Sequence, residues 1–166
     1  MRILGIDPGY AIVGYGVLDY QNNHFSVVEY GAITTPAGMD FNRRLELIFD
    51  EMEVIISRLK PDAMSIEKLF YNTNAKTVID VAQARGVIML AAQKNGVEAF
   101  EYTPLQVKQS VVGYGRAEKK QVQEMTKLIL RLSKVPKPDD TADALALAIC
   151  HGHSSGSLMG KLAKYR

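Results

Sequence analysis

The sequence predicts an α/β domain built on a five-stranded mixed sheet. Three observations support this class: three strand-like segments come first, later strands alternate with helices, and 166 residues suffice for one buried core. Strands joined by short turns pair antiparallel, whereas strands joined through a helix pair parallel. We therefore expect an antiparallel meander that is extended by two strands reached through helices.

Turn residues separate the first three predicted strands. The apolar run 3–6 is followed by Asp7 and then by Pro8-Gly9, which is typical of a buried strand that ends in a turn. Apolar and aromatic residues then fill 12–20 and 25–34, on either side of a polar turn. Asp7 should therefore stand at the carboxyl edge of the sheet, where open α/β sheets place their chemistry.

The later elements are predicted from apolar spacing, helix caps and turn residues. Two further strands are expected over 63–67 and 97–102, and helices from Asp40 to just before Pro61, over 74–94, from Pro104 to Gly113, over 117–132 and over 140–151.

The predicted helix over 74–94 carries apolar or small residues on nearly every face. Val78, Val81, Ala82, Gly86 and Ile88 are examples. A helix that is apolar all round must be covered all round, and one sheet covers only one side. We expect a homodimer built across this helix, with cover from elsewhere in the same chain as the alternative.

One domain is expected over residues 1–153, followed by a flexible basic tail over 154–166. No apolar run reaches membrane-spanning length, and the apolar start of the chain is too short for a signal peptide. Cys150 is the only cysteine, which fits a reducing compartment. These features predict a cytoplasmic protein that has no membrane partner.

The positive charge is concentrated in one segment, although the net charge is only +2. Residues 106–138 hold eight lysines and arginines, among them Lys108, Arg116 and Lys119, against two glutamates. Such a segment on a slightly acidic body is typical of a face that binds nucleic acid. Solvated helix faces are the alternative interpretation.

Four carboxylates are candidates for one site. Glu67 follows its predicted strand just as Asp7 follows the first, so both emerge at one edge if the strands are parallel neighbours. Asp140 and Asp143 lie three apart at the start of the last helix and share a face, with Asp139 nearby. Taken singly, each acid could instead be a helix cap, a turn former or an exposed strand end.

Gathered together, these acids predict a metal site. Like charges on one side of a sheet are destabilising unless cations neutralise them. Carboxylate ligands without histidine favour Mg²⁺ or Mn²⁺ over zinc, and two such ions would support hydrolysis of a phosphodiester. The implied chemistry is that of a nuclease or strand-transfer enzyme.

An ordered set of motifs resembles the RuvC family of Holliday-junction resolvases. The motifs are Gly5-Ile6-Asp7-Pro8-Gly9 with Gly14-Tyr15-Gly16, Ile66-Glu67 followed by Phe70, Gln83-Ala84-Arg85-Gly86, Gln106-Val107-Lys108-Gln109 with Val111-Val112-Gly113, Glu118-Lys119 with Val122, and Asp140-Thr141-Ala142-Asp143-Ala144-Leu145-Ala146. They run in order to about His153 and cover nearly all of the chain.

The resemblance implies a ribonuclease-H-like fold with helices on both faces of the sheet, and a homodimer that resolves four-way DNA junctions by paired symmetric nicks. It assigns Asp7, Glu67, Asp140 and Asp143 as ligands of two Mg²⁺, with Mn²⁺ as a substitute. It also places two lysines, Lys108 and Lys119, near the scissile phosphate, and Phe70 on an unpaired base. A branch-migration helicase is the implied protein partner.

Other interpretations remain open at this point. The segment Asp7-Pro8-Gly9 also fits the first phosphate loop of a nucleotide-binding module of the actin and sugar-kinase type, although such proteins close two domains over the nucleotide. A ribonuclease acting on RNA–DNA hybrids would share the chemistry, and a catalytically idle DNA-binding relative is a third possibility. The segment Cys150-His151-Gly152-His153 lacks the spacing of a structural zinc site.

Overall fold

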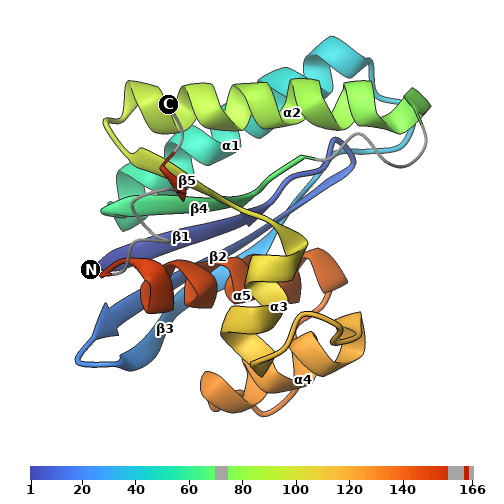
Figure 1. Cartoon of the computed structure of the whole chain (residues 1–166). Helices are drawn as coiled ribbons and strands as arrows, with labels where there is room; N and C mark the ends of the chain where they lie inside the picture. The colour runs from blue at the N-terminus through green and yellow to red at the C-terminus, as the bar shows by residue number, and fades with distance from the viewer. Residues whose placement is uncertain (70–74, 157–162, 165–166) are drawn as a thin grey trace.

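A computed structural model describes residues 1–69, 75–156, 163 and 164 and places one five-stranded sheet between two layers of helices (Figure 1). The strands are β1 (Arg2–Asp7), β2 (Ile12–Gln21), β3 (His24–Thr34), β4 (Ala63–Glu67) and β5 (Glu98–Tyr102), in the spatial order β3-β2-β1-β4-β5. The first three strands form an antiparallel meander, and β1, β4 and β5 run parallel. The predicted mixed sheet is confirmed.

Helices cover both faces of the sheet, as expected (Figure 1). Helices α1 (Phe41–Leu59) and α2 (Ala75–Lys94) pack on one face, and α5 (Asp139–Ser154) lies on the other. Helices α3 (Pro104–Val112) and α4 (Lys119–Ile129) pack against α5. The fourth helix starts two residues later than predicted because Glu118 forms a capping box with Gln121 at its start.

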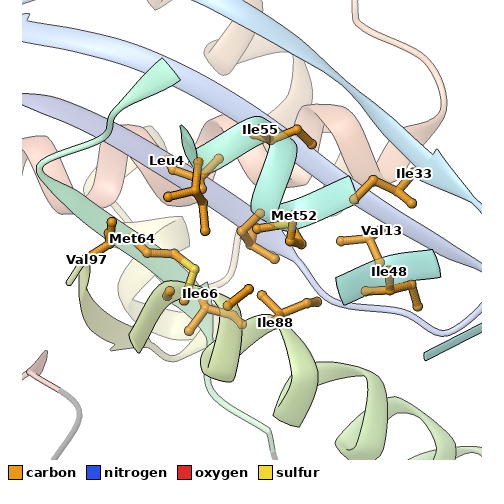
Figure 2. Close-up of a cluster of buried hydrophobic side chains, with 14 of the residues drawn as sticks. Leu4, Val13, Ile33, Ile48, Met52, Ile55, Met64, Ile66, Ile88 and Val97 are labelled. Carbon is orange, nitrogen blue, oxygen red and sulfur yellow. The ribbon is translucent and has the colours of Figure 1, made fainter. Parts of the chain in front are cut away.

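Strand alternation divides the core between the two faces. In β1, Leu4 and Ile6 point toward α1 and α2, where they join Met52 and Ile88 in the cluster that Figure 2 shows. Ile3, by contrast, packs with the α5 side. Asp7 therefore shares its face with Ile3 and points toward α5.

Two glycines allow α5 to lie unusually close to the sheet. A Cβ atom added at Gly14 of β2 would stand 2.0 Å from the carbonyl oxygen of Asp140. One added at Gly5 of β1 would stand 2.0 Å from the carbonyl oxygen of Ala144. Only glycine permits this approach, because any side chain would push the helix away from the strands.

Helix α2 is buried on one face only. Ala84, Ile88 and Ala91 pack into the core, whereas Ile79 is 61% exposed and Leu90 is 51% exposed. Within the described residues, no other element covers this outer face of α2, which carries Ile79, Ala82, Gly86 and Leu90. The expected apolar surface is present, and the homodimer remains a prediction.

Residues 163 and 164 contact strand β5. Ala163 is buried beside Tyr102, and Lys164 forms a β-bridge with Phe100 and an ion pair with Glu98. The domain boundary after residue 153 and the flexible tail remain predictions. None of the described helices is both long and apolar enough to cross a membrane.

Candidate active site

Asp7 and Glu67 end neighbouring parallel strands. Ile6 of β1 pairs with Ile66 of β4, so the two acids that follow emerge side by side at the carboxyl edge of the sheet. Both lie on the face that α5 covers, because alternation places Ser65 on that face and Glu67 two residues further on. The predicted meeting of these two carboxylates is confirmed.

The start of α5 brings the other two predicted acids to this edge. Asp7, Glu67 and Asp143 line one cavity of about 330 Å³. Asp140 does not line the cavity, but its charge acts on Asp7. The close approach of α5 at Gly14 thus delivers carboxylates from residues far along the chain to Asp7.

The acids disturb one another electrostatically. Burial and, to a smaller extent, the negative charges of Glu67, Asp143 and Asp140 together raise the pKa of the Asp7 carboxyl to about 8, against the opposing charge of Lys119. Burial and the charge of Asp143 likewise raise the pKa of Glu67. Without a cation, this cluster therefore favours a bound proton on Asp7 at neutral pH.

Two lysines line the same cavity as the acids. Lys108 comes from α3, whose start is fixed by a capping box between Thr103 and Gln106. Lys119 is the first residue of α4, and its Nζ lies 2.7 Å from Oδ2 of Asp143. Burial lowers the pKa of Lys119, but the bond to Asp143 and the charges of Asp139 and Asp7 outweigh it, so the net shift is upward.

Of the other two predicted DNA contacts, the structure describes only Arg116. Arg116 is exposed in the segment between α3 and α4 and does not line the cavity. Phe70 lies outside the described residues.

An apolar wall completes the cavity and was not predicted. It is formed by Pro104, Val107, Val122, Ala146 and Leu147. Val107 and Val122 stand near Lys108 and Lys119 in sequence, but only the packing of α3 and α4 against α5 shows that they border the acids. No sequence pattern distinguishes these residues from ordinary core positions.

The donor set fits a hard divalent cation. Carboxylate oxygens at partly buried positions with raised pKa values are what Mg²⁺ or Mn²⁺ neutralises. Within 1–69, 75–156 and 163–164, however, no three acid, histidine or cysteine side chains are already gathered as ligands around one point. Asp143 is engaged by Lys119 instead.

The strand order β3-β2-β1-β4-β5 and the acids at its carboxyl edge define a nuclease of the ribonuclease-H-like class. The family model described as "Crossover junction endodeoxyribonuclease RuvC" matches residues 3–151. The chain belongs to this RuvC family, whose nucleases use divalent metal ions.

Relatives match over nearly their full length. The chain is 61% identical over 162 residues to the crossover junction endodeoxyribonuclease RuvC of Ruminiclostridium cellulolyticum, covering 96% of this chain and 98% of that protein. It is 60% identical over 155 residues to the RuvC of Clostridioides difficile, covering 93% and 92%. These matches support an endodeoxyribonuclease.

Solved structures agree. Thermus thermophilus RuvC superimposes with a TM-score of 0.88 at 29% identity, covering 99% of this chain and 98% of that one. The same protein, described as in complex with Holliday junction substrate, gives 0.87 at 28% identity, covering 96% and 98%. The alternative of an actin-like nucleotide-binding module on Asp7-Pro8-Gly9 is not supported.

Proposed function

We propose that this protein is a homodimeric endodeoxyribonuclease that resolves four-way DNA junctions by paired symmetric nicks. The observation that carries the proposal is one cavity at the carboxyl edge of the sheet, lined by Asp7, Glu67 and Asp143 together with Lys108 and Lys119. Such a cavity joins carboxylates that hold cations to lysines that hold phosphate. The T. thermophilus relative described with a Holliday junction supports the choice of substrate.

Asp7, Glu67, Asp140 and Asp143 are the proposed ligands of two Mg²⁺ ions, with Mn²⁺ as a substitute. Asp7 is central, because the charges of all three other acids act on it. When bound, the cations supply Lewis-acid stabilisation of the charge that develops on the phosphate oxygens. The carboxylates hold and orient the cations, and the apolar wall limits the water around them.

The two lysines are the proposed phosphate contacts. Lys108 and Lys119 line the same cavity as the acids, and their ammonium groups would balance the charge of a bound phosphate. Arg116, exposed between the two helices, is a proposed contact to the DNA backbone. The proposed stacking of Phe70 on an unpaired base rests on the family resemblance alone.

The proposed dimer forms through the outer face of α2. Ile79 and Leu90 are exposed apolar side chains on one side of this helix, and Ala82 and Gly86 between them allow a second copy to approach closely. Two cavities at a fixed separation would fit two opposed strands of one junction. An ordinary duplex presents no such pair, so selectivity for junctions needs no contact with particular bases.

The proposed setting is the cytoplasm, where a branch-migration helicase would present the junction. Cys150 is buried and the described residues contain no disulfide, in keeping with the reducing compartment that the sequence predicts.

Cleavage of a synthetic four-way junction tests the proposal. In Mg²⁺, the wild-type protein should nick two opposed strands at mapped, symmetric positions and spare linear duplex and RNA–DNA hybrid controls. Asp7→Asn should bind the junction and cut it at least about a thousandfold more slowly, as expected when a group central to catalysis is lost. Asp50→Asn, which changes an exposed carboxylate on α1, should cut normally.

Two results would contradict the assignment. Cleavage by Asp7→Asn at the wild-type rate would remove Asp7 from the site. Equal or faster cutting of the RNA–DNA hybrid would favour the ribonuclease alternative.

A further inference from the structure

Lys119 holds one of the acids that a metal would need. Its Nζ lies 2.7 Å from Oδ2 of Asp143, within the range of a charge-assisted hydrogen bond. Asp143 is 26% exposed, and Lys119 is 59% exposed. The ammonium group therefore reaches into the cavity, while much of the side chain stays in solvent and has room to turn outward.

The same ammonium group is the main positive charge on the whole acid cluster. Lys119 opposes the negative charges around Asp7 and around Glu67 as well as binding Asp143. Lys108 lines the same cavity, but in the described part of the chain it forms no ion pair with any acid. Of the two lysines that line this cavity, Lys119 is thus paired with an acid, whereas Lys108 forms no ion pair among the described residues.

The backbone of Lys119 is held in place by the ordered start of α4. It follows Glu118, whose backbone N–H donates a hydrogen bond of 2.8 Å to Oε1 of Gln121 in the capping box that starts α4. Val122, one turn further along α4, is buried in the wall of the cavity. The start of α4 therefore aims Lys119 at Asp143.

We propose that Lys119 is a built-in counter-ion of the acid cluster, which releases Asp143 when a divalent cation binds and then turns to the DNA phosphate. The inference rests on the proposed metal-dependent function and adds a second role to Lys119. A dication on Asp143 replaces the attraction that holds the ammonium group and repels it at short range. The released lysine then stands beside the cavity with no partner until a phosphate arrives.

This exchange predicts a competition that can be measured without DNA. Removing the ammonium group frees Asp143, so Lys119→Met should bind Mn²⁺ about fivefold more tightly than the wild-type protein, the scale expected for a partly exposed ion pair. Lys119→Arg retains a cation and should bind Mn²⁺ within about twofold of the wild type. Loss of the electron paramagnetic resonance signal of free Mn²⁺ reports this affinity directly.

Lys108→Met is the matched control. It removes one positive charge from the same cavity but breaks no ion pair among the described residues, so its affinity for Mn²⁺ should rise by less than about twofold. Thermal unfolding with and without Mn²⁺ gives a second readout. The rise in melting temperature that Mn²⁺ produces should be larger for Lys119→Met than for the wild type or Lys108→Met.

The outcomes separate this inference from the function beneath it. If wild type binds Mn²⁺ but Lys119→Met binds it no more tightly than Lys108→Met, the counter-ion role is overturned and the metal site stands. If wild type binds no Mn²⁺, or if Asp7→Asn binds it equally well, the metal site is overturned and the counter-ion role with it.

Discussion

The hydroxyl group of Ser65 donates a hydrogen bond of 2.7 Å to the carbonyl oxygen of Leu147. Both partners are buried, and the bond joins β4 to α5 across 82 residues of sequence. Glu67 lies two residues beyond Ser65, and Asp143 lies one helical turn before Leu147. This bond therefore sets the distance between two elements that each bring an acid to the cavity.

Ser65→Ala should destabilise the protein by about 1 kcal/mol, the usual net contribution of one buried hydrogen bond. Loss of this bond should also let β4 and α5 shift relative to each other, and with them Glu67 and Asp143. Junction cleavage should therefore fall severalfold. Unfolding in urea and single-turnover cleavage measure the two effects. Ser57→Ala, at an exposed position on α1, is the control and should match wild type in both. Wild-type stability of Ser65→Ala would show that the bond contributes nothing.

Gly14→Ala should separate α5 from the sheet. The added methyl group would lie 2.0 Å from the carbonyl oxygen of Asp140. Its nearest neighbours are all backbone atoms of α5, so no side chain can turn aside to relieve the clash. We expect a loss of about 3 kcal/mol in the free energy of unfolding. Displacement of Asp140 and Asp143 should slow cleavage about a hundredfold in the protein that remains folded.

Gly156→Ala provides the comparison, because a Cβ atom there meets nothing within 4 Å. Its stability and cleavage rate should stay close to those of the wild type. If Gly14→Ala behaved in the same way, the close approach of α5 would not be what assembles the site.

Much of this arrangement could be predicted from sequence. Apolar runs that each end in one acid placed Asp7 and Glu67 at strand ends, and the intervening helix made their strands parallel. The acids at the start of the last helix were visible as a cluster. Their meeting with Asp7 followed from the family resemblance, since sequence spacing does not show which face of the sheet a helix covers.

Other features depend on tertiary packing and could not be predicted. The ion pair between Lys119 and Asp143 joins two helices whose relative position only the core decides. The all-round apolar pattern of α2 did not show which side is buried. Packing against α1 covers Ala84 and Ile88 and leaves Ile79 in solvent.

The stability of the metal-free protein should depend on pH through Asp7. Its pKa of about 8 in the folded protein stands above the ordinary value of 3.8, so the folded state binds a proton that the unfolded chain has lost. This contribution is fully present below pH 4 and is lost as pH rises through about 8. Stability should therefore fall across this window, by at most about 1.4 kcal/mol per pH unit.

Urea unfolding in chelator at several pH values measures this slope. Asp7→Asn cannot titrate and should show a flatter profile, with a clear gain over wild type at pH 8. Asp50→Asn should keep the wild-type profile because its carboxylate is exposed on α1. Parallel profiles for wild type and Asp7→Asn would mean that Asp7 is ionised in the folded protein throughout the window.

A charge on the outer face of α2 should produce monomers. Ala82 is exposed between Ile79 and Gly86, and a glutamate there would bury its charge against a second copy without a partner. Sedimentation should show a dimer for the wild type and a monomer for Ala82→Glu. Val54→Glu, at a position 57% exposed on α1, should remain dimeric.

The monomer separates assembly from chemistry. Ala82 does not line the cavity that holds the acids, so Ala82→Glu should keep its affinity for Mn²⁺. On a junction, the monomer should nick one strand at a time and lose the coordinated second cut, because a lone subunit carries one cavity. Paired cutting by a protein that sediments as a monomer would show that selectivity for junctions does not come from two cavities held at a fixed separation. A wild-type sedimentation profile for Ala82→Glu would place the dimer contact elsewhere than on α2.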